Sequence, residues 1–282
     1  MFGLTKQAEI DPPRPGAGTL VLPFGRARLL NFMPKGGDIV ELGVARAQFS
    51  IQLLRRVRPR RLTLIDAWEK QDETVYSGDG NNAPHDEQQR RYRKAQFLAS
   101  LARPLTRVEV WRAYTTTAAA HFENSSLDLV YVDANHGYSA VLDDLRHYEP
   151  KVRPAGLLMG HDFTGPHTGH IGVATAVTAF LRESTEWRLF AITVEHFPTF
   201  VLGRDAAAEH VLFRNLYRRG VAQIMVDPAA ILTLRLTRLS VPRQRRKALM
   251  RLGFPPHQEQ NCDHTETAQA AAGSGPRSRG SS

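Results

Sequence analysis

Short apolar runs alternate with longer amphipathic stretches between residues 38 and 204. The runs end in glycine or a polar residue, and the stretches between them place apolar residues three and four positions apart, the spacing of a helix face. We therefore interpret the runs as strands and the stretches as helices. The predicted strands are residues 38–43, 61–66, 107–111, 127–133, 155–162, 187–195 and 199–204. The predicted helices are residues 49–57, 86–102, 138–152 and 171–183.

This order of elements predicts an α/β fold. Strands that alternate with helices form a parallel, doubly wound sheet with helices on both faces. The last two strands are separated only by His196, Phe197 and Pro198, so they are predicted to form a hairpin whose final strand is antiparallel. An ordinary dinucleotide-binding domain would continue with parallel units instead.

Composition divides the chain into three parts. Prolines and glycines concentrate near the start, and residues 1–24 are predicted to be an N-terminal leader. Residues 25–204 hold the α/β domain. Residues 205–282 are predicted to be a basic C-terminal extension with one helix near its start, disordered from about residue 255.

The formal net charge of +9, from 37 basic and 28 acidic residues, suggests an anionic partner. However, residues 205–282 contain 12 basic and 6 acidic residues, so +6 of the charge belongs to the extension. Within it, residues 229–252 are basic and apolar, as in segments that contact a membrane surface. They lack interleaved aromatic residues, which argues against nucleic acid as the partner.

Three further features bear on location. Cys262 is the only cysteine, so an internal disulfide and a cysteine zinc site are excluded. No run of about 18 apolar residues is present to cross a membrane, and the N-terminus lacks the apolar core of a signal peptide. A cytoplasmic protein is expected. The oligomeric state stays open, and a homo-oligomer is one alternative.

Candidate chemistry lies at the ends of the predicted strands, where doubly wound sheets bind ligands. The residues there are Glu41, Leu42, Gly43, Asp66, residues 112–115, Asp133, His136, His161 and Asp162. The turn after the first strand lacks G-x-G-x-x-G, which disfavours a pyrophosphate cradle. Asp66 suits two ribose hydroxyls as a two-oxygen acceptor, although a solvated carboxylate at a strand end is the simpler alternative.

The segments VELGVARAQFS, LTLIDAW and LDLVYVDANHGYSAVLDDLRHYEPKVRPAGLLMGHDF resemble the class I S-adenosylmethionine-dependent methyltransferases, most closely methyltransferase family 24. The resemblance covers residues 25–204 and is most specific at residues 127–162. It implies a seven-stranded sheet with an antiparallel last strand, in agreement with the predicted hairpin, and methyl transfer from S-adenosylmethionine.

The resemblance also implies roles for residues of the cofactor site. Glu41 and Gly43 match the motif that holds the methionine part, and Asp66 matches the acid that binds the ribose hydroxyls. Ala47 replaces a usual glycine of the first motif, and its methyl group is expected to tighten the site or weaken binding. The remaining residues assigned to the cofactor are Trp68, Tyr114, Thr115 and Asp133.

A metal site and a base are also predicted. Asp133, His161 and Asp162 end adjacent strands, and two carboxylates with one imidazole suit Mg²⁺ or Mn²⁺. His136 matches the position of a catalytic base in related metal-dependent O-methyltransferases, and an ordinary histidine pKa suits that role at neutral pH. The alternative is that Asp133 contacts only the cofactor and His161 simply packs.

Together these observations predict a methyltransferase that methylates a hydroxyl of a small molecule, such as a sugar or a secondary metabolite, with help from a divalent metal. Two alternatives stay open. One is an RNA or protein methyltransferase that docks its substrate through the basic extension. The other is a non-catalytic protein with a degenerate cofactor fold that binds a membrane surface or a partner.

Overall fold

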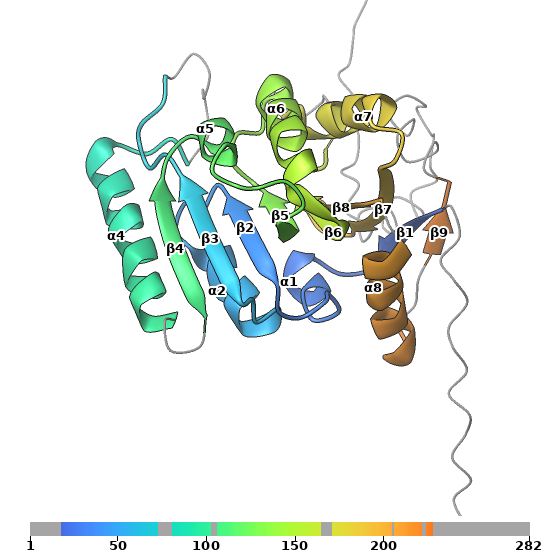
Figure 1. The fold of residues 1–282 in the computed structure, drawn as a ribbon. Coiled ribbons are helices and arrows are strands. Elements are labelled where there is room, and N and C mark those ends of the chain that lie inside the picture. The colour runs from blue at the N-terminus through green and yellow to red at the C-terminus, as the bar shows by residue number, and fades with distance from the viewer. Residues whose placement is uncertain are drawn as a thin grey trace, which may run out of the picture.

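A computed structural model describes residues 18–72, 81–102, 106–164, 171–204, 206–221 and 224–227 of the chain. Its strands form one sheet in the order β4-β3-β2-β5-β6-β8-β7-β1-β9 (Figure 1). The strands are β1 (Thr19–Leu22), β2 (Asp38–Leu42), β3 (Arg61–Asp66), β4 (Arg107–Arg112), β5 (Leu127–Val132), β6 (Val152–Gly160), β7 (Arg188–Thr193), β8 (Phe200–Gly203) and β9 (Ile224–Val226). The helices are α1 (Arg26–Leu29), α2 (Gln48–Arg56), α4 (His85–Ala102), α5 (Thr115–Ala119), α6 (Tyr138–Tyr148), α7 (Val173–Glu183) and α8 (Ala206–Arg218), with a 3₁₀ turn at Glu149–Lys151.

The predicted architecture is confirmed. Strand β2 lies between β3 and β5 and runs parallel to both. Strand β8 is antiparallel to β6 and to β7, which confirms the hairpin. One predicted helix is shorter than expected: α6 ends at Tyr148 rather than at residue 152. Pro150 follows closely, and proline lacks the backbone N–H that a continuing helix needs.

Two strands lie outside the predicted domain of residues 25–204. Strand β1, within the predicted leader, pairs in parallel with β7, and all four of its residues are buried. Strand β9, within the predicted extension, pairs with β1. The sheet therefore extends beyond both predicted boundaries. The local pattern missed β1 because its apolar run is only four residues long and its partner lies about 170 residues away in sequence.

Helices cover both faces of the sheet, and each face has its own apolar core (Figure 1). One core joins α1, α2, α4 and α8 to the sheet and includes Leu53 and Leu216. The other joins α5, α6 and α7 to the opposite face and includes Leu145 and Phe180. Burying one such side chain stabilises the fold by about 1.5–3 kcal/mol. The strand ends and their loops are thus held on a packed platform.

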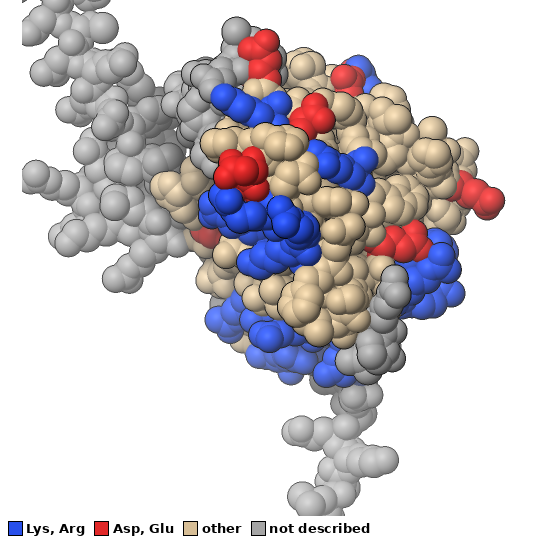
Figure 2. Space-filling model, turned by 90° about the vertical axis from the view of Figure 1, so that its left-hand side faces the viewer, with Lys and Arg blue, Asp and Glu red and all other residues tan. Residues whose placement is uncertain are grey.

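The described surface carries charges of both signs. Figure 2 shows the side of the molecule on which α4 and β4 lie, where Lys and Arg gather among scattered acidic residues. On α4 the exposed basic residues are Arg90, Arg93 and Lys94, and Arg90 pairs with Asp86 at 3.0 Å. No helix of the described residues is long and apolar enough to cross a membrane. Residues 229–252, the predicted membrane-contact segment, and the predicted disorder from residue 255 lie outside the described residues.

Candidate functional site

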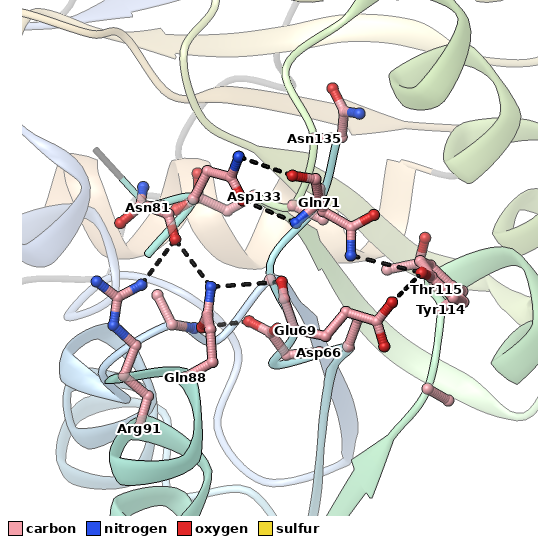
Figure 3. A pocket seen from close by; sticks show the side chains of 16 residues that line it. Asp66, Glu69, Gln71, Asn81, Gln88, Arg91, Tyr114, Thr115, Asp133 and Asn135 are labelled. Atoms are coloured by element: carbon pink, nitrogen blue, oxygen red, sulfur yellow. Dashed lines mark hydrogen bonds between the residues drawn. The ribbon is translucent and has the colours of Figure 1, made fainter. Parts of the chain in front are cut away.

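A pocket of about 740 Å³, including solvent at its mouth, opens at the carboxyl ends of β2, β3, β4 and β5 (Figure 3). The order of the strands reverses between β2 and β5, and doubly wound sheets bind ligands at this reversal. The residues that line the pocket are Gly43, Ala45, Asp66, Ala67, Glu69, Gln71, Asn81, Asn82, Gln88, Arg91, Ala113, Tyr114, Thr115, Asp133, Ala134 and Asn135.

Gly43 lies tightly against the backbone that follows β5. Its φ is +82°, and a Cβ there would overlap the backbone carbonyl of Asp133. The N–H of Asp133 donates to the Leu42 carbonyl at 2.8 Å, so the two strand ends stay joined at this level. Only glycine fits this position. Gly43 also lines the pocket, and its predicted role in holding the methionine part of the cofactor stays a prediction.

Asp66 fixes the loop that follows β2. Its Oδ2 accepts hydrogen bonds from the backbone N–H groups of Val44 (2.9 Å) and Ala45 (2.8 Å), and its Oδ1 accepts one from Trp68 (2.7 Å). A carboxylate offers about four acceptor positions, so these bonds leave room for a ligand hydroxyl. Asp66 lines the pocket, as expected of the predicted ribose acceptor.

Tyr114 and Thr115 form part of the pocket wall, as predicted for the adenine side. The Tyr114 hydroxyl donates to Glu69 Oε1 at 2.7 Å, and Gln71 Nε2 donates to the same hydroxyl at 3.4 Å (Figure 3). The Thr115 hydroxyl donates to the carboxylate of Asp144 on α6. These bonds connect the β4–α5 loop to the loop after β3 and to the neighbouring helix.

The opposite wall contains residues that sequence reasoning missed. The Asn81 carbonyl accepts hydrogen bonds from Arg91 Nη1 (2.8 Å) and Gln88 Nε2 (3.1 Å), both on α4 (Figure 3). Asn82 and Gln71 exchange two hydrogen bonds across residues 73–80, which lie outside the described part. Residues 69–85, before the predicted helix, contain no apolar periodicity and no motif, so nothing in their sequence points to individual pocket residues.

Three predicted cofactor residues do not line the pocket, and Trp68 and Glu41 are two of them. The Trp68 ring is fully buried against Tyr92, and its Nε1 donates to the Ala45 carbonyl at 3.2 Å. The assignment of Trp68 to the adenine is therefore not supported, because the ring lies behind the wall. Glu41 is also buried, and burial raises its pKa to about 8, which favours the protonated acid at neutral pH.

Ala47 also lies away from the pocket. It is 1% exposed, packs into one of the apolar cores and precedes α2 with a φ of +58°. This left-handed backbone costs an alanine about 1–2 kcal/mol relative to glycine. The expected tightening of the cofactor site by its methyl group is therefore not supported. The usual glycine at this position is explained by the backbone rather than by space for a ligand.

A second group of polar residues gathers at the ends of β5 and β6. His136 Nε2 lies 2.9 Å from Asp162 Oδ2 and 3.5 Å from Asp133 Oδ1. One ligand atom of each of these three residues lies within 4.8 Å of the other two. Asp162 has a left-handed backbone (φ +54°), which aspartate tolerates better than most residues. The carbonyl of His136 accepts a hydrogen bond from Gly172, which fixes the β5–α6 loop.

The two histidines differ from their predicted placement. The predicted metal ligands were Asp133, His161 and Asp162, but His136 completes the compact group. His161 lies beside it, with Nδ1 3.1 Å from Asp162 Oδ1 and 3.7 Å from Asp133 Oδ1. All four residues thus come together as expected, while the imidazole at the centre is the one predicted to be a base.

The charges around His136 oppose its predicted role as a base at neutral pH, because they favour the protonated imidazole. Burial alone would lower its pKa, but the carboxylates of Asp133 and Asp162 together raise it to about 10. Burial alone would raise the pKa of Asp162, but the two imidazoles hold it below the ordinary value. His136 is therefore protonated in this arrangement, and it must lose that proton before it can accept another or bind a metal.

Arg26 is a further member of this group that sequence reasoning missed. Its Nη1 donates to Asp133 Oδ2 at 2.7 Å and to the Tyr131 hydroxyl at 2.5 Å. Burial lowers its pKa, but Tyr131 and Asp133 more than offset this, so the pKa lies above the ordinary value. Arg26 begins α1 shortly after β1, and because the local pattern missed β1, the strand-end pattern could not reveal Arg26.

Comparison with known protein families identifies the domain that contains this site. A family model described as a methyltransferase domain, family 24, matches residues 40–163. Residues 40–163 are a family 24 methyltransferase domain. The chain is thus an S-adenosylmethionine-dependent methyltransferase. The matched segment of the methyltransferase runs from β2 to just beyond β6, and so contains the pocket and most of the charged group, but not Arg26.

Solved structures resemble this methyltransferase at low sequence identity. The tRNA methyltransferase TrmK of B. subtilis is 11% identical with a TM-score of 0.42, covering 69% of this chain and 68% of its own. An rRNA methylase of Streptococcus thermophilus is 8% identical with a TM-score of 0.42, covering 63% and 93%. A spermidine synthase is 11% identical with a TM-score of 0.42, covering 80% and 72%. No curated protein gives a match.

Proposed function

We propose that this methyltransferase transfers a methyl group to a hydroxyl of a small molecule, such as a sugar or a secondary metabolite, with a divalent cation bound beside the acceptor. The observation that carries the proposal is the double position of Asp133. This residue lines the cofactor pocket and also belongs to the group with His136 and Asp162. The place for the methyl donor and the candidate cation site therefore adjoin.

The residues fit Mg²⁺ or Mn²⁺. Two carboxylates and one imidazole within 4.8 Å form a hard, mostly oxygen donor set, and water and acceptor oxygens would complete an octahedron. Asp133, His136 and Asp162 would hold the ion, and when bound it would lower the pKa of a hydroxyl that contacts it.

The chain's own residues supply alignment and charge. The backbone at Gly43 and the carboxylate of Asp66 would hold the methyl donor at the ends of β2 and β3. The sulfonium methyl group is electrophilic by itself, so the main requirement is an acceptor oxygen placed in line with it. His136, in its neutral form, would either bind the cation or take the acceptor proton. Its protonated form, favoured in the metal-free arrangement, can do neither.

The test uses the full chain with S-adenosylmethionine, Mg²⁺ or Mn²⁺, and a panel of sugars, diols and phenols, with methylated products detected by mass spectrometry. We expect transfer to a hydroxyl that is lost with EDTA and restored by added metal. Transfer should fall at least about a hundredfold in His136→Ala, the range for loss of a group acting directly in the reaction.

Each part of the proposal can fail separately. Full activity in EDTA would remove the metal, and unchanged turnover of His136→Ala would remove that residue's role. Methylation of RNA or protein but of no small hydroxyl compound would replace the proposed acceptor class and leave the methyltransferase intact. Calorimetry with S-adenosylmethionine provides the control that each variant still binds the methyl donor.

A further inference from the structure

Each carboxylate of the charged group directs one oxygen toward His136 and has a partner on the other. Asp133 Oδ1 and Asp162 Oδ2 lie 3.5 Å and 2.9 Å from His136 Nε2. Asp133 Oδ2 accepts hydrogen bonds from Arg26 at 2.7 Å and from the Tyr131 hydroxyl at 3.2 Å. Asp162 Oδ1 lies 3.1 Å from Nδ1 of His161. His161 Nδ1 also lies 3.7 Å from Asp133 Oδ1. A cation at the centre would therefore meet the histidine-facing oxygen of each carboxylate, while the other oxygen keeps its own partner.

Arg26 is fixed by the elements around it. Its backbone N–H donates to Glu195 Oε1 at 2.8 Å, and the same oxygen accepts bonds from the hydroxyls of Thr193 (2.6 Å) and Thr199 (3.0 Å) in the β7–β8 hairpin. The guanidinium lies 5.0 Å from the centre of the Phe49 ring. The hairpin thus anchors the start of α1, and the aromatic ring supports the charged end of the side chain.

We propose that Arg26 is a positioning residue that restricts Asp133 to one metal-facing oxygen, so that the site selects a small octahedral cation over Ca²⁺. The inference rests on the proposed metal site. Ca²⁺ takes six to eight oxygen ligands and commonly binds both oxygens of a carboxylate, whereas Mg²⁺ requires six ligands near an ideal octahedron and keeps several waters. Mn²⁺ favours a similar octahedral oxygen site. With Arg26 and Tyr131 on Oδ2, Asp133 cannot offer the second oxygen that Ca²⁺ would use.

The test measures cation selectivity rather than catalysis. Mn²⁺ binding to the full chain is followed by electron paramagnetic resonance, and Ca²⁺ is then titrated as a competitor. In Arg26→Met, we expect the ratio of Ca²⁺ affinity to Mn²⁺ affinity to rise about tenfold or more, because Oδ2 becomes free to bind. Loss of the positive charge strengthens the binding of both ions, so the ratio isolates the change in ligand geometry.

Two further variants guard the interpretation. Arg28→Met removes a positive charge from the same helix, where Arg28 lies over Phe24 rather than near Asp133. Its ratio should stay within about twofold of the wild-type value, because the field of this exposed charge is screened by solvent and salt. Tyr131→Phe keeps the ring that stacks on Phe49 and removes only the hydroxyl, so it should fold. Its ratio should rise about threefold, less than in Arg26→Met, because Arg26 still holds Oδ2.

An unchanged ratio in both Arg26→Met and Tyr131→Phe would overturn the proposal, as would an equal rise in Arg28→Met. If Mn²⁺ binds to none of these proteins, the selectivity role and the metal part of the proposed function both fall. Methyl transfer that persists in EDTA would then show that the proposed acceptor chemistry survives without them. If wild-type protein binds Mn²⁺ and loses activity with EDTA while the ratio does not move, only the role of Arg26 is lost.

Discussion

Two buried aspartates near the site have opposite electrostatic surroundings. We call the pocket lined by Gly43, Asp66 and Thr115 the donor side, and the charged group of Asp133, His136 and Asp162 the acceptor side. Asp144, under the donor side, receives a hydrogen bond from the Thr115 hydroxyl, and burial raises its pKa to about 7. Asp162, on the acceptor side, faces the imidazoles of His136 and His161, which outweigh burial and lower its pKa. At neutral pH the same residue type is thus only partly ionised in one region and fully charged in the other.

The two sides also differ in the kind of interaction that holds them together. On the donor side, Asp66 accepts hydrogen bonds from backbone N–H groups of nearby loops, and the backbone carbonyl of Asn81 accepts hydrogen bonds from side chains of α4. On the acceptor side, charged side chains from α1 and from the ends of β5 and β6 face one another. The donor side therefore depends on local backbone geometry, and the acceptor side depends on charge balance among distant segments.

Asp162→Asn is the strongest test that the two sides act separately, because it removes a charge from the acceptor side without changing the shape of the side chain. We expect methyl transfer to fall about a thousandfold, in the range for loss of a group that acts directly on the reacting atoms. The affinity for S-adenosylmethionine should change by less than about threefold, since Asp162 does not line the donor pocket. Single-turnover transfer and calorimetry measure the two quantities. A comparable loss of donor affinity would mean that the two sides are not separate.

The next largest effect concerns stability and pH at Asp144. Its folded-state pKa of about 7 exceeds the ordinary value of 3.8, so the native protein holds a proton that the unfolded chain releases between these pH values. Stability should therefore fall as pH rises from about 4 to 7, by up to about 4 kcal/mol from this group. Asp144→Asn should remove this loss, as measured by urea unfolding at pH 5 and pH 8.

The matched control for Asp144 is Asp143→Asn, one position earlier on α6. The Asp143 side chain is half exposed and lies 3.9 Å from Arg146, an exposed pair that contributes little. This variant should therefore keep most of the wild-type pH dependence, because the charge of Asp143 is the smallest of the causes that raise the pKa of Asp144. If Asp143→Asn and Asp144→Asn flatten the profile equally, burial of Asp144 is not its cause.

A smaller effect is expected on the donor side, from Asp66→Asn. The amide cannot accept with both atoms, so it loses part of a charge-assisted set of bonds, each worth about 1.5–3 kcal/mol. We expect affinity for S-adenosylmethionine to fall about 10- to 100-fold, with transfer at saturating donor reduced much less. Calorimetry and steady-state kinetics separate the two effects. A reduced maximal rate with unchanged affinity would place Asp66 on the acceptor side of the comparison.

The sequence predicted the fold well because the alternation of apolar strands with amphipathic helices repeats locally along the chain. It also predicted that Asp133, His136, His161 and Asp162 would meet, because parallel strands in one sheet bring their carboxyl ends to the same edge. It could not predict which imidazole takes the central place, since that depends on the left-handed backbone of Asp162 and on the path of the β5–α6 loop.

Other features were missed for physical reasons of the same kind. Arg26 reaches Asp133 across 107 residues of sequence, and Glu195 fixes it from the opposite end of the domain. Trp68 follows a strand and looked available to a ligand, but its left-handed backbone (φ +42°) and its packing on Tyr92 place the ring inside. Such placements depend on tertiary packing and leave no periodic or motif signal.

The smallest expected effect is that of Ala47→Gly. This variant restores the glycine that is usual at this position, and it tests whether Ala47 affects binding of the methyl donor. Glycine would relieve a left-handed backbone worth about 1–2 kcal/mol. It would also lose a buried methyl group worth about 0.8 kcal/mol and add about 0.5–1 kcal/mol of unfolded-state entropy. These effects nearly cancel, so urea unfolding should show a change below about 1 kcal/mol. Donor affinity should stay the same, because Ala47 lies away from the pocket.

Ala45→Gly is the matched comparison, since Ala45 is also left-handed (φ +44°) but lines the pocket and donates its N–H to Asp66. Freeing this backbone should weaken donor binding by about two- to fivefold, through the extra entropy lost when the loop is ordered. If Ala47→Gly shifts the affinity as much as Ala45→Gly does, the first motif acts on the donor as a unit. If only Ala45→Gly does, the alanine at position 47 is a matter of backbone conformation and leaves the methyl donor site intact.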